Sequence, residues 1–111
     1  MHARLNAAHF EGRLPPIKFR LSGRMRTRLG ELAMDAKSAQ PLEIAMSRAH
    51  IRHGWVEVER TVLHEMVHQW QAESGLPVDH GTAFRRKARA VGIEPTARRH
   101  LGHSGHRRTT D

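Results

Sequence analysis

The alternation of apolar and polar residues in the first half of the chain predicts three short strands. Residues 17–21 (IKFRL) alternate strictly between apolar and basic side chains, as a half-buried strand with outward-facing cations does. Residues 42–47 have the same period of two, and residues 30–34 show it more weakly. Between the last two runs, residues 35–41 have the composition of a turn or loop.

The period changes to that of a helix in the second half of the chain. From residue 56 or 57 to Ser74, apolar residues recur at helical spacing. Gly75 follows directly and Pro77 comes two residues later, which is the stop signal expected after a helix. This segment is therefore predicted to be the longest helix of the protein.

Two shorter helices are predicted on either side of the long one. Residues 5–10 form a short helix that Gly12 and the following prolines stop, and we expect it to lie against the long helix. The last helix begins near Gly81 and ends at Gly92. Its apolar stripe, spaced i, i+4 and i+7, consists of Phe84, Ala88 and Val91. Phe84 is thus predicted to be a core residue.

Together these elements predict a small α+β domain. A short antiparallel three-stranded sheet is expected to pack on the long helix, with the shorter helices flanking it.

The long helix contains the one motif with evident chemistry, an H-E-x-x-H set formed by His64, Glu65 and His68. Two imidazoles four residues apart on a helix lie one turn above each other on the same face, so both can reach one metal ion. Glu65 follows His64 by about 100° around the axis, where a carboxylate can deprotonate a water molecule beside the metal. A third imidazole is on offer at His80, just after the helix ends.

The alternative to a functional motif is that these residues occur at this spacing by chance. In a chain with 10 histidines among 111 residues, an H-E-x-x-H set would occur about one time in ten or twenty. The context favours the functional interpretation, because a broad apolar face lies on the side of the helix away from His64 and His68, which are then expected to look into a cleft. This face consists of Val58, Val62, Leu63, Met66, Val67 and Trp70.

The chain resembles a known family at these residues. The run His64-Glu65-Met66-Val67-His68-Gln69-Trp70, followed by His80-Gly81 and Phe84, is similar to the SprT-like zinc metalloproteases, which include the DNA–protein crosslink protease Spartan. Further matches to the opening pattern and the glycine before the middle strand are Asn6, His9-Phe10, Leu14-Pro15 and Leu29-Gly30. The resemblance covers roughly residues 5–92. H-E-x-x-H alone is common to many zinc peptidases, but its pairing with a nearby His-Gly-x-x-Phe is much more specific.

The resemblance implies a zincin-like domain, hydrolysis of proteins near or crosslinked to DNA, and hence a role in DNA–protein crosslink repair. Coordination chemistry agrees with the enzymatic part. Zinc held by His64, His68 and His80 keeps a fourth position for water, which is typical of a catalytic rather than a structural site. Glu65 is then the general base that takes the proton of that water.

Length and composition limit the other possibilities. The 111 residues suffice for one domain, predicted over residues 1–95, and residues 96–111 form a basic, histidine-containing tail that we expect to be flexible. The absence of cysteine excludes disulfides and the cysteine-ligated zinc ribbon that some SprT-like proteins append. Because no apolar run is long enough for a membrane helix or signal peptide, we expect a cytoplasmic protein. We also expect it to be a monomer.

The positive charge is concentrated at the C-terminal end. Of the net charge of +8, six units lie from Arg85 onward, where there are eight basic and two acidic residues. Such asymmetry suits an anionic partner, and the resemblance makes DNA the first candidate. The residues expected to contact it are Arg85, Arg86, Arg89, Arg98, Arg99, Arg107 and Arg108. A tail that is merely solvated and disordered is the open alternative.

The remaining histidines are weaker candidates for metal binding. His50 and His53 are three residues apart in a glycine-containing connector, which is more typical of a solvated loop. His100, His103 and His106 are also spaced by three, but the glycines between them argue against a rigid helix that would present them to a second ion.

Two carboxylates near the motif each allow two roles. Glu57 projects on the histidine side and could accept a ligand's second N–H, but a solvent-facing carboxylate in the first turn is favoured. Asp79 could orient a zinc ligand, but capping of the helix that begins near Gly81 is favoured.

Two other functions stay open. One is a nucleic-acid-binding module in which zinc is structural and Glu65 is incidental. The other is a generic small zinc peptidase whose turnover is indifferent to DNA and to salt.

Overall fold

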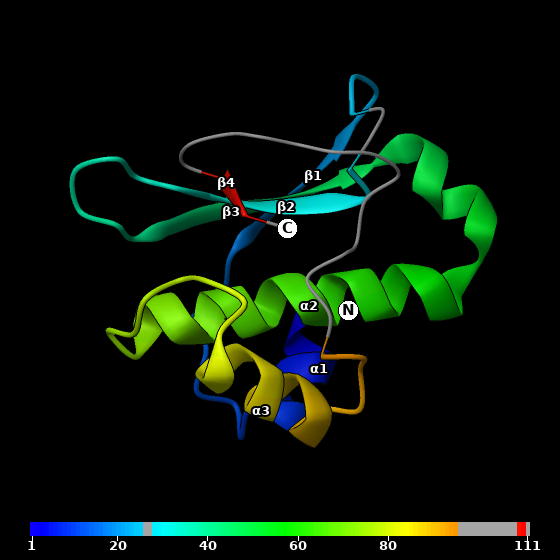
Figure 1. Ribbon diagram of the computed structural model, residues 1–111. Coiled ribbons are helices and arrows are strands. Elements are labelled where there is room, and N and C mark those ends of the chain that lie inside the picture. The colour runs from blue at the N-terminus through cyan, green and yellow to red at the C-terminus, as the bar shows by residue number, and fades with distance from the viewer. Residues whose placement is uncertain (26–27, 96–108, 111) are drawn as a thin grey trace.

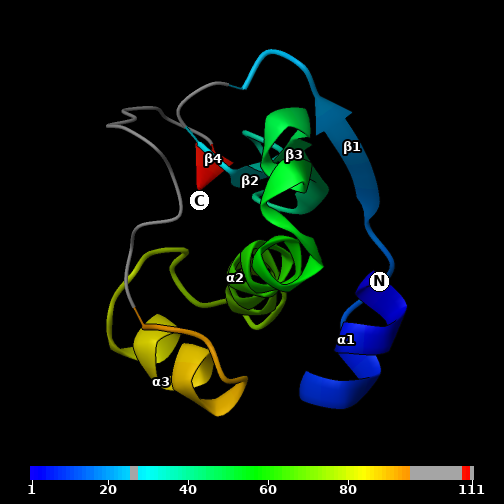
Figure 2. The same ribbon diagram turned by 90° about the vertical axis from the view of Figure 1, so that its right-hand side faces the viewer.

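The structure is a computed structural model that describes residues 1–25, 28–95 and 109–110. Its elements are α1 (His2–His9), β1 (Lys18–Ser22), β2 (Gly30–Met34), β3 (Pro41–Ser47), the 3-10 helix η1 (Arg48–His53), α2 (Trp55–Glu73), α3 (Thr82–Ala90) and β4 (Thr109–Thr110). Helix α2 lies in the middle, with the sheet on one side and α1 and α3 on the other (Figures 1 and 2). No helix in the described ranges has the length and apolar character that crossing a bilayer requires.

The α+β class and the three predicted strands are confirmed, but the predicted antiparallel sheet is wrong. The strand order is β1-β3-β2-β4. Strand β2 is antiparallel to β3 and to the two-residue β4, whereas β1 is parallel to β3. The sheet is therefore mixed. The zincin-like character of the domain stays a prediction.

The parallel pairing follows from the path of the chain around β3. The last residues of β1 and β3, Ser22 and Ser47, are partners, and Gly30 at the start of β2 pairs with Met46. After β1 the chain thus crosses to the other side of β3, where β2 runs in the direction opposite to β1. Strand β3 then returns between β1 and β2 and reverses the direction a second time. Two reversals leave β1 and β3 pointing the same way. Ser47 holds the connection at this end, since its N–H donates to the Leu29 carbonyl at 2.9 Å.

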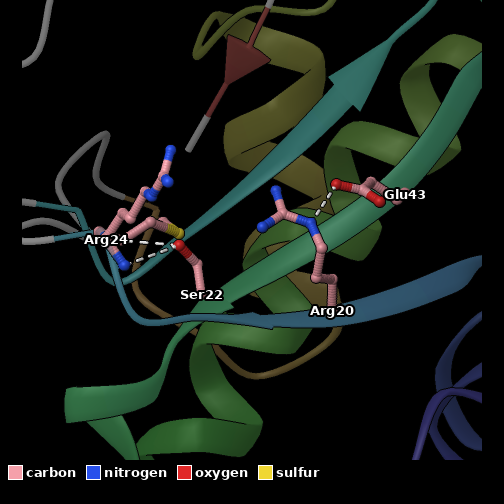
Figure 3. A network of polar contacts seen from close by, with 5 residues as sticks. Arg20, Ser22, Arg24 and Glu43 are labelled. Carbon is pink, nitrogen blue, oxygen red and sulfur yellow. Dashed lines mark hydrogen bonds and ion pairs between the residues drawn. The ribbon is translucent and has the colours of Figure 1, made fainter.

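Figure 3 shows how β1 joins β3 and then ends. The Arg20 guanidinium donates to the Glu43 carboxylate at 2.8 Å across the two strands. The Ser22 hydroxyl oxygen accepts the backbone N–H of Arg24 at 3.2 Å, a local turn that ends the strand. Phe19 and Leu21 are 39% and 49% exposed. The predicted half-buried strand is therefore an edge strand whose apolar residues are only partly covered.

The core surrounds α2, with one part between this helix and the sheet and the other between it and α1 and α3. Leu32 and Ile44 are register partners and are fully buried with the apolar residues of the helix. Gly30 allows the close approach of the two layers, because a Cβ there would lie 2.8 Å from the Thr61 methyl carbon and 3.2 Å from the Met46 sulfur. A glycine at the start of β2 thus sets the distance between strand and helix.

Helix α1 packs on α2 as predicted. Leu5 and Phe10 are buried in the core, and the ring nitrogen of His2 lies 2.9 Å from the Gln69 amide oxygen of α2. The Asn6 side chain makes two bonds to the backbone of Leu14, donating at 2.8 Å and accepting at 3.1 Å. These contacts hold the N-terminal segment against the face of α2 away from the sheet.

Helix α2 ends as its sequence predicts, and the ending turns the chain back. Gly75 has φ +74°, its N–H donates to Ala72 O at 3.1 Å, and the Leu76 N–H donates to Gln71 O at 2.9 Å. This is the Schellman arrangement in which a glycine adopts the left-handed conformation. Residues 76–81 then bring His80 back toward α2 before α3 begins.

Candidate metal centre

The central turns of α2 are buried on every side. All residues from 61 to 69 are buried, and His64, Glu65 and His68 are fully so. The prediction that the histidine side of the helix looks into a cleft is therefore wrong for His64 and His68. Phe84 of α3 and His80 of the preceding loop both lie against the rings of His64 and His68. Of the three predicted ligands, His80 alone is partly exposed.

The structure brings the three predicted metal ligands together. His64 and His68 come from consecutive turns of α2, and their ring centroids are 5.1 Å apart. The His80 ring lies 5.4 Å from that of His64 and 4.7 Å from that of His68. One ring nitrogen of each residue lies within 4.8 Å of the others, so the three could hold one metal ion.

The donor set fits a transition metal with nitrogen ligands. The Nε2 atoms of His68 and His80 are 3.1 Å apart. Two nitrogens bound at about 2.0–2.1 Å to one tetrahedral ion lie about 3.3 Å apart, so this spacing matches that of two ligands in one coordination shell. Among the described residues the group consists of three imidazoles alone, and three nitrogen donors suit an ion that keeps one position open.

Phe84 supports all three rings. This fully buried side chain of α3 stacks on the His68 ring at 4.7 Å and 24°, and meets His64 and His80 edge-on at 5.0 and 4.8 Å. The prediction that Phe84 is a core residue is confirmed. Its place in the core is the floor of the histidine cluster, where an apolar ring limits the positions that the imidazoles can take.

Gln71 is the partner of the cluster that sequence reasoning missed. Its side-chain oxygen lies 2.9 Å from Nδ1 of His68, and its side-chain nitrogen donates to the Asp79 carboxylate at 3.4 Å. The available signal was its position three residues after His68, which places both on one face of the helix. A hydrogen-bonding residue at that position can reach the second ring nitrogen of a ligand.

Asp79 does not cap α3 as predicted. The N-cap of α3 is Gly81, which has no side-chain cap bond. The Asp79 carboxylate instead accepts the backbone N–H of Gly81 at 3.0 Å, next to the bond from Gln71. The carboxylate therefore braces the loop that carries His80.

The other candidates near the motif lie elsewhere. The Glu57 carboxylate is 41% exposed and lies 3.5 Å from Arg60, in keeping with the favoured solvent-facing role. His50, expected in a solvated loop, is instead buried in η1, with Nε2 2.9 Å from the Thr61 hydroxyl. His53 is exposed, and neither η1 histidine joins the three-histidine group. Both line a separate open pocket of about 390 Å³ beside Arg48.

The predicted DNA-contacting residues are only partly within the described chain. Arg85, Arg86 and Arg89 are exposed on α3. Lys87 instead lies 5.1 Å from the Phe10 ring and 5.2 Å from the Trp70 ring, so its charge is directed at the interior side of the helix. The predicted contacts Arg98, Arg99, Arg107 and Arg108, and the tail histidines His100, His103 and His106, lie outside the described residues.

The fold and the site define an α+β protein in which three histidines, from one buried helix and the loop that follows it, could hold a metal ion. The model of the SprT-like family matches residues 1–101, and the chain belongs to this family. A search of curated proteins and a search of solved structures each gave no significant match.

Proposed function

We propose that this protein is a zinc-dependent metallopeptidase. The observation that carries the proposal is the convergence of His64, His68 and His80, with the fully buried Glu65 directly after His64 in the same helix. Burying a carboxylate raises the free energy of the folded state unless the carboxylate is paired, hydrogen-bonded or close to a metal ion, so such a residue suggests a function. Membership of the SprT-like family supports the same activity.

The residues of the site have three different roles: metal binding, positioning of the ligand rings and proton transfer. His64, His68 and His80 would hold zinc through ring nitrogens, and Phe84 keeps their rings in place. When bound, zinc supplies Lewis acidity, polarising a peptide carbonyl and lowering the pKa of a water molecule to about 7. Glu65 accepts a proton from the water that attacks the carbonyl carbon. The same carboxylate returns that proton to the amine nitrogen as the C–N bond breaks.

Replacing Glu65 with glutamine tests the reaction. Glu65→Gln keeps the size of the side chain but removes its basicity, so we expect peptide hydrolysis to fall by roughly 10²- to 10⁴-fold. Zinc content and melting temperature should stay near those of the unmodified protein, measured by metal analysis and thermal denaturation.

The control is His64→Ala, which should lose activity and zinc together. Undiminished proteolysis by Glu65→Gln would refute the role of Glu65. A protein with bound zinc but no peptidase activity before mutation would favour a nucleic-acid-binding module with a structural metal.

We further propose that the substrates are proteins near or crosslinked to DNA, with the enzyme acting inside the cell as a monomer. DNA as the partner is supported by the charge distribution: six of the eight net charges follow residue 84, and Arg85, Arg86 and Arg89 are exposed on α3. This helix also carries Phe84 beneath the histidines, so DNA bound along α3 would keep a crosslinked protein close to the metal centre.

The salt dependence of DNA binding tests this part. The logarithm of the binding constant for DNA falls linearly with the logarithm of the salt concentration. For each arginine that no longer neutralises a phosphate, the steepness of this line should decrease by about 0.9. Replacing Arg85, Arg86 and Arg89 with glutamine should therefore reduce the slope by about 2 to 3. The matched control replaces Arg4, Arg13 and Arg60, which are exposed but paired with carboxylates, and should change it little.

Equal slopes for the two triple variants would show that α3 is not part of the DNA-binding surface. Proteolysis that is indifferent to DNA and salt would identify a generic zinc peptidase.

A further inference from the structure

We infer that Gln71 and Asp79 act as a positioning pair for the metal centre, fixing which nitrogen of His68 binds the ion and where His80 is held. The inference rests on the proposed zinc site and deepens it. It concerns residues that neither contact the ion nor take part in proton transfer. The Gln71–Asp79 pair links the helix that carries two ligands to the loop that carries the third.

The carboxylate of Asp79 determines how the Gln71 amide is turned. An ionised carboxylate only accepts hydrogen bonds, so the amide nitrogen of Gln71 must face it, as it does at 3.4 Å. The amide oxygen must then face the opposite way, toward Nδ1 of His68 at 2.9 Å. The orientation of the amide thus follows from the chemistry of its two partners.

The orientation of the amide selects the tautomer of His68. An amide oxygen only accepts, so Nδ1 of His68 must carry the proton, and Nε2 is left with its lone pair. That Nε2 is the atom that lies 3.1 Å from Nε2 of His80, on the side where an ion would be shared. The pair therefore prepares the ring for metal binding before any metal arrives.

The same carboxylate positions the loop of the third ligand. Asp79 precedes His80 directly, and it accepts the N–H of Gly81 on the other side of that histidine at 3.0 Å. A Cβ on Gly81 would lie 3.2 Å from the Asp79 oxygen, so the backbone turns closely around the carboxylate. The bond from Gln71 then ties this turn to α2.

Burial makes the arrangement effective. Gln71 and His68 are fully buried, whereas Asp79 is exposed. A buried amide must satisfy its hydrogen bonds locally, so it holds the ring firmly. The negative charge behind it polarises the amide, as carboxylates do behind other metal-bound histidines.

Zinc affinity measured by competition with a chromophoric chelator provides the first test. Gln71→Leu removes the link while keeping the side chain's bulk, and we expect zinc to bind about 10- to 100-fold more weakly. The matched control is Gln69→Leu, which removes an equally buried amide of the same helix that bonds His2 and the Pro15 carbonyl instead. The control should bind zinc with unchanged affinity.

The tautomer of His68 in the zinc-free protein, read from imidazole ¹⁵N chemical shifts, is a measurement that a merely structural role would not move. We expect the Nδ1–H form in the unmodified protein and a mixture in Gln71→Leu. Asp79→Asn offers Gln71 a donor as well as an acceptor, so it should fix the amide less strictly and give a tautomer ratio and a zinc affinity between those of the unmodified protein and Asp79→Ala. Asp79→Ala, at an exposed position, should show the mixed tautomer and the weaker zinc binding even if Gln71→Leu proves too unstable to study.

The outcomes separate the positioning role from the proposed function. Equal zinc affinities for Gln71→Leu and Gln69→Leu, or an unchanged His68 tautomer in Asp79→Ala, would overturn the positioning pair and leave the peptidase proposal intact. An unmodified protein that takes up no zinc would refute the zinc site, while the tautomer in the zinc-free protein would still decide whether the pair orients His68.

Discussion

Two histidine pairs in neighbouring helices have similar spacing but different surroundings. The rings of His50 and His53 in η1 are 5.4 Å apart, and those of His64 and His68 in α2 are 5.1 Å apart. The α2 pair meets a third imidazole, His80, whereas the η1 pair does not belong to such a group in the described part of the chain. Two donors at this spacing are thus not enough to indicate a metal site, and the third donor is what makes the α2 pair a candidate for one.

The second difference lies in what the ring nitrogens contact. Nε2 of His50 lies 2.9 Å from the Thr61 hydroxyl and 3.3 Å from the Glu57 carbonyl, so this ring is a structural link between η1 and α2. Nε2 of His68 faces another imidazole nitrogen instead. A buried histidine whose nitrogen contacts a hydroxyl serves packing, whereas two ring nitrogens this close together can share a proton or a cation.

The largest expected effect is the loss of metal when the third donor is removed. His80→Ala should weaken zinc binding by more than the roughly 10- to 100-fold that the loss of an outer partner costs, because a direct ligand disappears. His53→Ala, which removes an exposed imidazole, should bind zinc as before. Zinc content per chain after dialysis checks this, and equal losses would contradict the choice of His80.

The next effect is the stabilisation that the metal gives to the fold. Zinc at 100 times its dissociation constant should add about 2.7 kcal/mol to the free energy of unfolding. In a domain of this size that corresponds to roughly 10 °C or more in melting temperature. Adding a chelator should lower the melting temperature of the unmodified protein by this amount, but should leave the melting temperature of the His80→Ala variant almost unchanged. A melting curve of the unmodified protein that ignores the chelator would argue against the site.

A smaller effect is expected in the η1 pair. His50→Ala removes the contacts to Thr61 and to the Glu57 carbonyl, so the free energy of unfolding should fall by about 1–3 kcal/mol. Exposed His53, replaced by alanine, should change it by no more than about 0.5 kcal/mol. Urea denaturation measures both. If His50→Ala released zinc without destabilising the fold, the division between the two pairs would be wrong.

The elements with strong local signals could be predicted from the sequence. The extent of α2 needed only its apolar spacing and the glycine at position 75, which adopts the left-handed conformation that ends the helix. The histidine pair in α2 and the third donor at His80 also followed from spacing and resemblance. These features depend on residues within a few turns of one another, where geometry is nearly invariant.

The direction of β1 could not be predicted in this way. Alternation of apolar and polar residues identifies a strand but not its neighbour, and β1 lies beside β3 rather than beside β2. The burial of His50 was missed for a related reason, because its partner Thr61 lies on another helix, 11 residues away. The direction of β1 and the burial of His50 both depend on contacts between separate elements of the folded chain.

Local patterns were enough to predict the three α-helices, the first three strands and the donor residues of the site, though not the 3-10 helix η1, since the period of apolar residues and the spacing of histidines act over single turns. The mixed sheet, the Phe84 ring under the histidines and the link from His68 through Gln71 to Asp79 became visible only in the folded chain. The physical reason is that hydrogen bonds and ring contacts between distant segments require layers packed at a fixed distance, and this distance is set jointly by many side chains.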